Sequence, residues 1–177
     1  MIPIDDKNYR VIKKQLGREP LNLLGIARTC PYDKPAVLVT NPYEEGRVFP
    51  TTYWLSCPHL VKEVSRIEDK GLIKELTARL KEDKDFKNKM DKAHKHYAQK
   101  RVELLTKDPD QLPKDIKRVI TTSGVGGIRD KEGIKCLHTH LADYMVNQIN
   151  PVGKLVYELV EWPDQCDSCF IDENNES

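Results

Sequence analysis

The sequence predicts an α+β fold, in which a small antiparallel sheet from the N-terminal third packs against several helices. Two observations predict it. Short β-prone segments bounded by proline and asparagine follow one another closely before Cys57, as in strands that pair with their neighbours. Beyond Pro58, apolar residues recur at helical spacing within strongly charged stretches.

The first third is expected to contain a short helix and three strands. Charged residues alternate with Tyr9, Ile12 and Leu16 over residues 5–16, which indicates an amphipathic helix. Strands are predicted at 23–30, 36–40 and 48–56, the last because it is rich in aromatic and β-branched residues.

The rest of the chain is predicted to be mainly helical. Pro58 begins one helix and Gly71 separates it from a second, while Asp85 caps a third that reaches about residue 105. Residues 116–122 fit either a strand or a helix. Two further helices are expected at 134–149 and 151–162, separated by Asn150-Pro151.

Length and composition restrict the class of protein. A chain of 177 residues with 38% hydrophobic residues is expected to form one domain, residues 1–163, followed by an acidic tail, residues 164–177. With 29 basic and 28 acidic residues it has no global field for nucleic acid or an anionic membrane, so neither is expected as a partner. The N-terminus lacks the apolar region of a signal peptide, which predicts a cytoplasmic protein.

One candidate metal site joins the helix that begins near Ile134 to the tail. Cys136 and His140 are four residues apart, a spacing that brings two side chains of one helix to the same ion. The tail adds Cys166 and Cys169 as a Cys-x-x-Cys pair. Three thiolates and one imidazole suit a structural zinc that ties the tail to the body, although iron–sulfur ligation is also compatible. The alternative is that the tail cysteines are incidental.

The start of this helix decides which residues can act together. If the helix is regular from Ile134, then Ile134, Leu137, Leu141 and Met145 form its core face, and His138 points the same way. Cys136, His140 and Asp143 then lie on the opposite face, so Cys136 and His138 cannot both bind one ion. If the helix begins only after Cys136, that residue lies on the preceding loop, and Cys136 and His138 can share a ligand.

A second candidate site combines Cys30, Cys57 and His138. Each cysteine ends a predicted strand and precedes a proline, so both can lie at one edge of the sheet. Convergence with His138 would give a three-ligand catalytic metal, or a cysteine nucleophile with a histidine base. The alternative is that all three are ordinary buried residues.

Two other features concern anions and histidines. The loop that contains Gly124, Gly126, Gly127 and Arg129 offers backbone N–H groups and a cation, so it is either an anion-binding loop or a plain turn. His94 and its neighbour at position 96 lie on a charged helix and are expected to be solvated.

Several phrases also carry a family resemblance. They are Gln15-Leu16-Gly17-Arg18, Phe49-Pro50-Thr51-Thr52-Tyr53, Cys57-Pro58, Gly71-Leu72, Gly126-Gly127, Lys135-Cys136-Leu137-His138 and Asn150-Pro151-x-Gly153. From about residue 10 to 155 the chain resembles domain-of-unknown-function family 501, a set of small bacterial proteins. The resemblance implies a bacterial cytoplasmic setting and no particular activity. Its phrases include Cys57, Cys136 and His138 but not the tail cysteines, which favours the second candidate site.

Three functions remain open from the sequence. The leading prediction is a metal-binding protein, with zinc held by Cys136, His140, Cys166 and Cys169. The second is a cysteine- or metal-dependent enzyme that acts on a small anionic substrate. The third is a metal-free module whose charged helices bind another protein.

Overall fold

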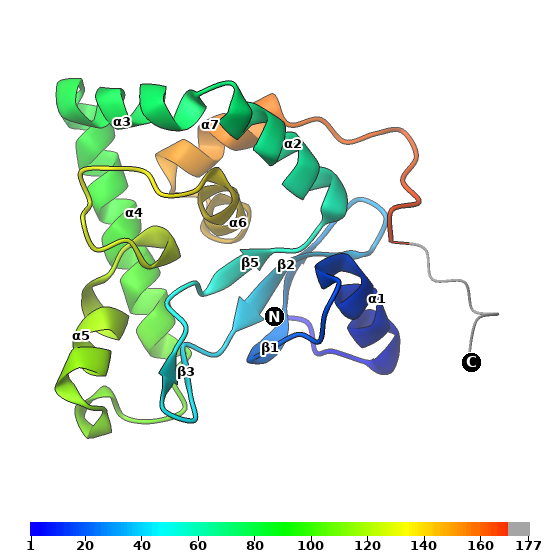
Figure 1. Cartoon of the computed structure of the whole chain (residues 1–177), viewed down its shortest axis with the longest axis horizontal. Helices are drawn as coiled ribbons and strands as arrows, with labels where there is room; N and C mark the ends of the chain where they lie inside the picture. Colours follow the sequence, from blue (N-terminus) through cyan, green and yellow to red (C-terminus); the bar gives the residue numbers. More distant parts are fainter. Residues whose placement is uncertain (170–177) are drawn as a thin grey trace.

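The computed structural model describes residues 1–169 and shows an α+β fold, as predicted (Figure 1). The strands are β1 (Leu23–Thr29), β2 (Pro35–Thr40), β3 (Tyr43–Glu44), β4 (Arg47–Val48) and β5 (Tyr53–Leu55). The α-helices are α1 (Asp6–Leu16), α2 (Pro58–Asp69), α3 (Leu72–Glu82), α4 (Lys84–Glu103), α5 (Lys114–Thr122), α6 (Leu137–Asn147) and α7 (Pro151–Leu159). Two 3₁₀ turns, η1 (Pro109–Gln111) and η2 (Val125–Gly127), lie between the later helices.

The main sheet is antiparallel, with strand order β1-β2-β5, and both of its faces are covered. Because side chains alternate along β2, Leu38 points to one face, where it packs with Ile12 of α1 and Ile26 of β1. Val37 and Val39 point to the other face, which belongs to the larger core. The sheet therefore separates α1 from the other helices.

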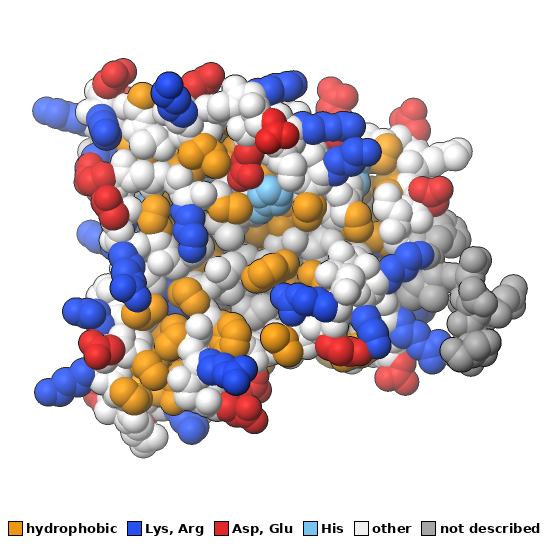
Figure 2. Space-filling model, viewed as in Figure 1, with side chains coloured by type: hydrophobic (Ala, Val, Ile, Leu, Met, Phe, Trp, Pro, Cys, Tyr) orange, Lys and Arg blue, Asp and Glu red, His pale blue; other side chains and the backbone are white. Residues whose placement is uncertain are grey.

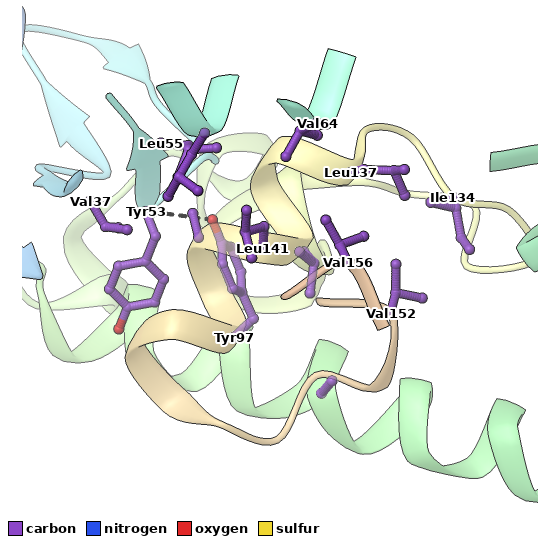
Figure 3. Packing of buried hydrophobic residues seen from close by; sticks show 14 of the residues in the cluster. Val37, Tyr53, Leu55, Val64, Tyr97, Ile134, Leu137, Leu141, Val152 and Val156 are labelled. Carbon is purple, nitrogen blue, oxygen red and sulfur yellow. Dashed lines mark hydrogen bonds between the residues drawn. The ribbon is translucent and has the colours of Figure 1, made fainter. Parts of the chain in front are cut away.

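Helix α6 is the centre of the larger core. It packs against α2, α7 and the sheet, and the ring of His140 lies 6.5 Å from that of His94 on the long helix α4 (Figure 1). Leu137 and Leu141 are fully buried, and Figure 3 shows Leu141 between Leu55 of the sheet and Val156 of α7, with Leu137 beside Ile134. Tyr97 of α4 joins the sheet to this core, since its hydroxyl accepts a hydrogen bond of 2.7 Å from the backbone N–H of Thr52. The side chains on α6 are thus positioned by packing on several sides.

The structure corrects some predicted boundaries. The predicted strand 48–56 is divided into β4 and β5, with Pro50 in the interruption, because proline cannot donate to a strand ladder. The ambiguous segment at 116–122 belongs to helix α5.

The prediction that His94 is solvated was wrong. Its side chain is buried, because α4 packs against η2 as well as α7. Among residues 1–169, no helix is both long and apolar enough to cross a bilayer.

Candidate metal centre

The start of helix α6 determines the geometry of the site. The helix begins at Leu137, three residues later than predicted, and Cys136 is the extended residue before it (φ −161°, ψ 127°). This is the arrangement in which Cys136 and His138 can act together. Cys136 Sγ lies 3.4 Å from Nδ1 of His138.

Glu68, in the last turn of α2, completes the group. Its Oε1 lies 3.3 Å from Nδ1 of His138 and accepts a 2.7 Å hydrogen bond from the backbone N–H of Leu137. The carboxylate thus also satisfies a free N–H group at the start of α6, where negative charge is favourable. One ligand atom from each of Glu68, Cys136 and His138 lies within 4.8 Å of the other two.

The second nitrogen of His138 holds the ring in place. Nε2 lies 3.1 Å from the carbonyl oxygen of Val61 and 3.4 Å from the hydroxyl of Ser65. Val61, Ser65 and Glu68 are spaced i, i+4 and i+7, so they lie along one side of α2. When Nε2–H donates to the Val61 carbonyl, Nδ1 presents its lone pair to Cys136 and Glu68, which is the usual orientation of a metal-binding histidine.

The surroundings of His138 stabilise positive charge. Its pKa is raised to about 9, first by the hydrogen bond with Cys136 and then by the charges of Cys136 and Glu68, against the opposing effect of burial. The side chains of His138 and Glu68 are 21% and 24% exposed, so the group is reachable from solvent.

A groove of about 640 Å³ leads to this group. Cys136 and His138 line it together with Trp54 of the sheet. The groove also contains three cationic side chains, and none of its described lining residues is acidic: the cations are Arg18, Lys62 and Lys135. Figure 2 shows a histidine near the centre of one face of the molecule, with acidic side chains beside it and Lys and Arg side chains around the neighbouring hollow.

The first predicted ligand set is spread over different surroundings. His140 is buried, and its Nδ1 lies 3.2 Å from Oδ1 of Asn150. Cys166 is half-buried, and the buried Cys169 accepts a 3.1 Å hydrogen bond from the side chain of Gln15. Among residues 1–169, these side chains form no group of three or more ligand atoms within 4.8 Å of one another. A site with these four ligands stays a prediction.

The residues of the second predicted site, Cys30, Cys57 and His138, also lie in different surroundings. Cys30 and Cys57 are buried in the hydrophobic core, whereas His138 faces Glu68 and the groove. Burial raises the pKa of the Cys57 thiol to about 11, with smaller contributions from Cys30 and Cys169. A thiol in this state is a poor nucleophile at neutral pH.

Hydrogen bonds within the loop and close packing against it explain why residues 124–127 are rich in glycine. The N–H groups of Gly124 and Gly127 donate to Ile128 and Gly124 within the loop. A side chain at Gly124 would lie 2.3 Å from the His94 ring, and one at Gly126, where φ is 63°, would lie 2.8 Å from Thr139. Arg129 lines a separate cavity of about 380 Å³ with Arg118 and Lys131. Anion binding by Gly124, Gly126, Gly127 and Arg129 stays a prediction.

Sequence reasoning did not identify Glu68. The residue follows Leu60 and Val64 at intervals of four, so it continues the buried column of α2. The available signal was a carboxylate in line with the apolar residues of α2, because a carboxylate that is partly buried requires a partner inside the protein. The partner could not be named without the fold, since Glu68 and His138 are 70 residues apart.

These features define the class: a small α+β protein with a Glu–Cys–His group at the end of a cationic groove. The chain matches the family model described as "Protein of unknown function (DUF501)" over residues 26–158, and it belongs to that family, as the sequence phrases predicted. The matched segment contains Glu68, Cys136 and His138, whereas Cys166 and Cys169 lie beyond it. Neither a curated protein nor a solved structure matches the chain.

Proposed function

We propose that this protein binds a zinc ion through Glu68, Cys136 and His138, with the fourth position of the ion directed toward the groove. The observation that carries the proposal is the spacing of the three ligand atoms. Sγ to Nδ1 is 3.4 Å and Nδ1 to Oε1 is 3.3 Å.

These separations match the geometry of tetrahedral zinc. With a Zn–S bond of about 2.3 Å and Zn–N and Zn–O bonds of about 2.0–2.1 Å, tetrahedral angles place sulfur and nitrogen about 3.5 Å apart, and nitrogen and oxygen about 3.4 Å apart. One ion at normal bond lengths can therefore contact all three groups with only small side-chain adjustments. The hydrogen bond from Nε2 of His138 to Val61 provides the outer support that zinc-binding histidines commonly have.

Because the group has three protein ligands and not four, the proposed zinc ion would be accessible to water or substrate. Structural zinc sites usually have four protein ligands, whereas catalytic sites have three and a water or substrate in the fourth position. Here the Glu68–Cys136–His138 group supplies three, and two of these residues line the groove. This differs from the closed, tail-binding zinc that the sequence favoured.

Elemental analysis of protein purified without added metal tests the proposal. Cys136→Ser and His138→Gln should each lower the zinc content by one ion per chain relative to the unmodified protein. His96→Gln, which changes a half-buried histidine on α4, is the matched control and should keep the zinc. Unchanged zinc content in both site variants would overturn the proposal. Unmodified protein without bound zinc, and without affinity for added zinc, would favour the metal-free interaction module.

The cationic groove favours one further function, which is a zinc-dependent enzyme acting on a small anionic substrate. A three-ligand zinc can lower the pKa of bound water or polarise a substrate oxygen. Arg18, Lys62 and Lys135 would hold the negative group of the substrate beside the ion. Within this proposal, Cys136 is a zinc ligand and not a nucleophile.

Inorganic phosphate is a simple probe of the groove. Trp54 lines it and is 42% exposed, and the other tryptophan of the chain, at position 162, can be replaced by Phe. In the zinc-loaded Trp162→Phe protein, phosphate should change the Trp54 fluorescence, and Lys135→Gln should weaken the apparent affinity several-fold. A phosphate response that is equal in the Lys135→Gln variant would argue against this use of the groove.

A further inference from the structure

The other four cysteines of the chain gather at one end of the main sheet. Cys30 follows β1 and Cys57 follows β5, and both flank the start of β2. The backbone N–H of Cys30 donates to the carbonyl of Lys34, and that of Cys57 lies 3.4 Å from the carbonyl of Ala36. The two cysteines belong to the same buried cluster.

The tail brings Cys166 and Cys169 to the same place. The side-chain nitrogen of Gln15 donates both to the carbonyl of Pro35 (2.8 Å) and to Sγ of Cys169 (3.1 Å), so Cys169 lies beside the first residue of β2. A second connection runs from the Tyr32 hydroxyl to the carbonyl of Pro163. Cys169 is only 6% exposed, which is unusual for a residue in a polar tail.

The electrostatics of these thiols agree with their proximity. The pKa of Cys169 is raised, first by burial and then by Cys166 and Cys30. Cys57 is affected by Cys30 and Cys169, after burial. Cys169 and Cys57 therefore each lie close enough to other members of the set to be affected by their charge, although these cysteines come from separate segments of the chain.

We infer that Cys30, Cys57, Cys166 and Cys169 form a second, structural zinc site that fastens the tail to the sheet. The chemistry of four thiolates suits a closed tetrahedral zinc with no position for substrate. Two ligands come from strand ends followed by proline, and two come from a Cys-x-x-Cys turn. This inference keeps the predicted role of the tail cysteines but replaces Cys136 and His140 with Cys30 and Cys57.

Binding of the ion requires the sulfurs to come closer together. Among the described residues, no three of these sulfurs lie within 4.8 Å of one another, whereas tetrahedral Zn–S bonds of about 2.3 Å require about 3.8 Å. The segment after α7 has no helix or strand up to Cys169, so it can adjust without breaking a regular element. Each thiol that binds loses its proton, and the ion replaces four protons at the site.

Cobalt substitution in a Cys136→Ser background tests the site separately from the proposed one. In that background, sulfur-to-cobalt charge-transfer absorption can come only from the other cysteines, and its intensity reports how many thiolates bind. We expect the absorption of four thiolates and one zinc per chain. Adding Cys166→Ser and Cys169→Ser should abolish both, while Ser168→Ala, a change within the same turn, should leave them unchanged.

Several outcomes would overturn the inference. They are no cobalt absorption in the Cys136→Ser protein, an intensity that corresponds to only two thiolates, or the brown absorption of an iron–sulfur centre in the unmodified protein. If Cys136→Ser and the tail double variant remove the same single ion, one site contains Cys136 and the tail cysteines, as the sequence first predicted. Loss of zinc only in Cys136→Ser would overturn this inference and leave the Glu68–Cys136–His138 site intact.

Discussion

His138 and His140 lie two residues apart on the same helix and have opposite surroundings. His138 faces α2 and the groove, where Cys136 and Glu68 raise its pKa to about 9. His140 faces the interior, where burial lowers its pKa to about 4. A rotation of about 200° along α6 therefore separates a histidine that can carry charge or a metal from one that stays neutral.

The surroundings of His140 form a sealed polar cluster. Asn150 donates to Asp143 (2.8 Å), lies next to Nδ1 of His140, and accepts from the N–H of Gly153 at the start of α7. His94 lies near His140, with ring centres 6.5 Å apart, and accepts a hydrogen bond from the backbone of η2. These side chains are buried and join α4, α6 and α7.

The different surroundings of His138 and His140 indicate that one group of side chains serves stability and the other serves metal binding. Buried polar groups that hydrogen-bond to one another fix the packing of the helices that carry them. The Glu68–Cys136–His138 group is instead partly exposed, and one ligand atom of each residue lies within 4.8 Å of the other two. We therefore expect changes in the sealed cluster around His140 to affect unfolding. Changes in the open group, which consists of Glu68, Cys136 and His138, should affect metal binding.

The largest effect on stability is expected at Asn150. Asn150→Ala removes the bond to Asp143, the contact with His140 and the cap of α7, which should lower the free energy of unfolding by about 3–4 kcal/mol. Urea unfolding measures the loss, and the folded variant should keep its zinc. Asn147→Ala is the control, because its side chain also donates to Asp143 but caps no helix, and it should cost about 1 kcal/mol. Equal effects of the two variants would contradict the central role of Asn150.

The two histidines of α6 provide the next comparison. In chelator-treated protein, His140→Ala should lower the free energy of unfolding by about 2–3 kcal/mol, because it leaves a cavity and removes a partner of Asn150. His138→Ala should cost about 1 kcal/mol or less, since its side chain is partly exposed. Zinc content should show the reverse order. A larger unfolding effect at His138 would mean that the open group is mainly structural.

A smaller effect concerns acid stability. The folded pKa of His140, about 4, is below the ordinary value of 6.5, so the unfolded state binds the proton more readily, and stability falls as the pH drops from about 6.5 toward 4. His140→Gln removes this group, so its loss of stability between pH 7 and pH 5 should be about 2 kcal/mol smaller than that of the unmodified protein. Asp143, whose burial raises its pKa to about 6, acts in the opposite direction in both proteins. Urea unfolding at the two pH values gives this difference, and identical losses would show that His140 is already protonated in the folded state.

The sequence predicted the fold class and the apolar stripe of α6, because both depend on local periodicity. It placed His140 and Asp143 on the face away from the core, which is wrong, because Asn150 and α7 cover that face as well. It also stated the condition under which Cys136 and His138 can meet, but not that the helix begins at Leu137. That start depends on Glu68, which binds the Leu137 N–H from a distant helix. The burial of His94 likewise results from packing between distant segments, which the charged pattern of α4 does not reveal.

The smallest change in stability, and the sharpest test of the open group, is expected at Glu68. Glu68→Gln keeps an oxygen that can accept from the N–H of Leu137, so the free energy of unfolding of the metal-free protein should change by less than about 1 kcal/mol. The same change removes the negative charge that faces His138, and zinc binds a neutral amide poorly compared with a carboxylate. The dissociation constant for zinc at this site should therefore rise at least about tenfold, which is about 1.4 kcal/mol of binding free energy. Competition with a chromophoric chelator measures it, and unfolding of the same samples shows whether the two effects separate. A large loss of stability with unchanged zinc affinity would make Glu68 a helix cap alone, and Cys136 and His138 would then lack the third ligand.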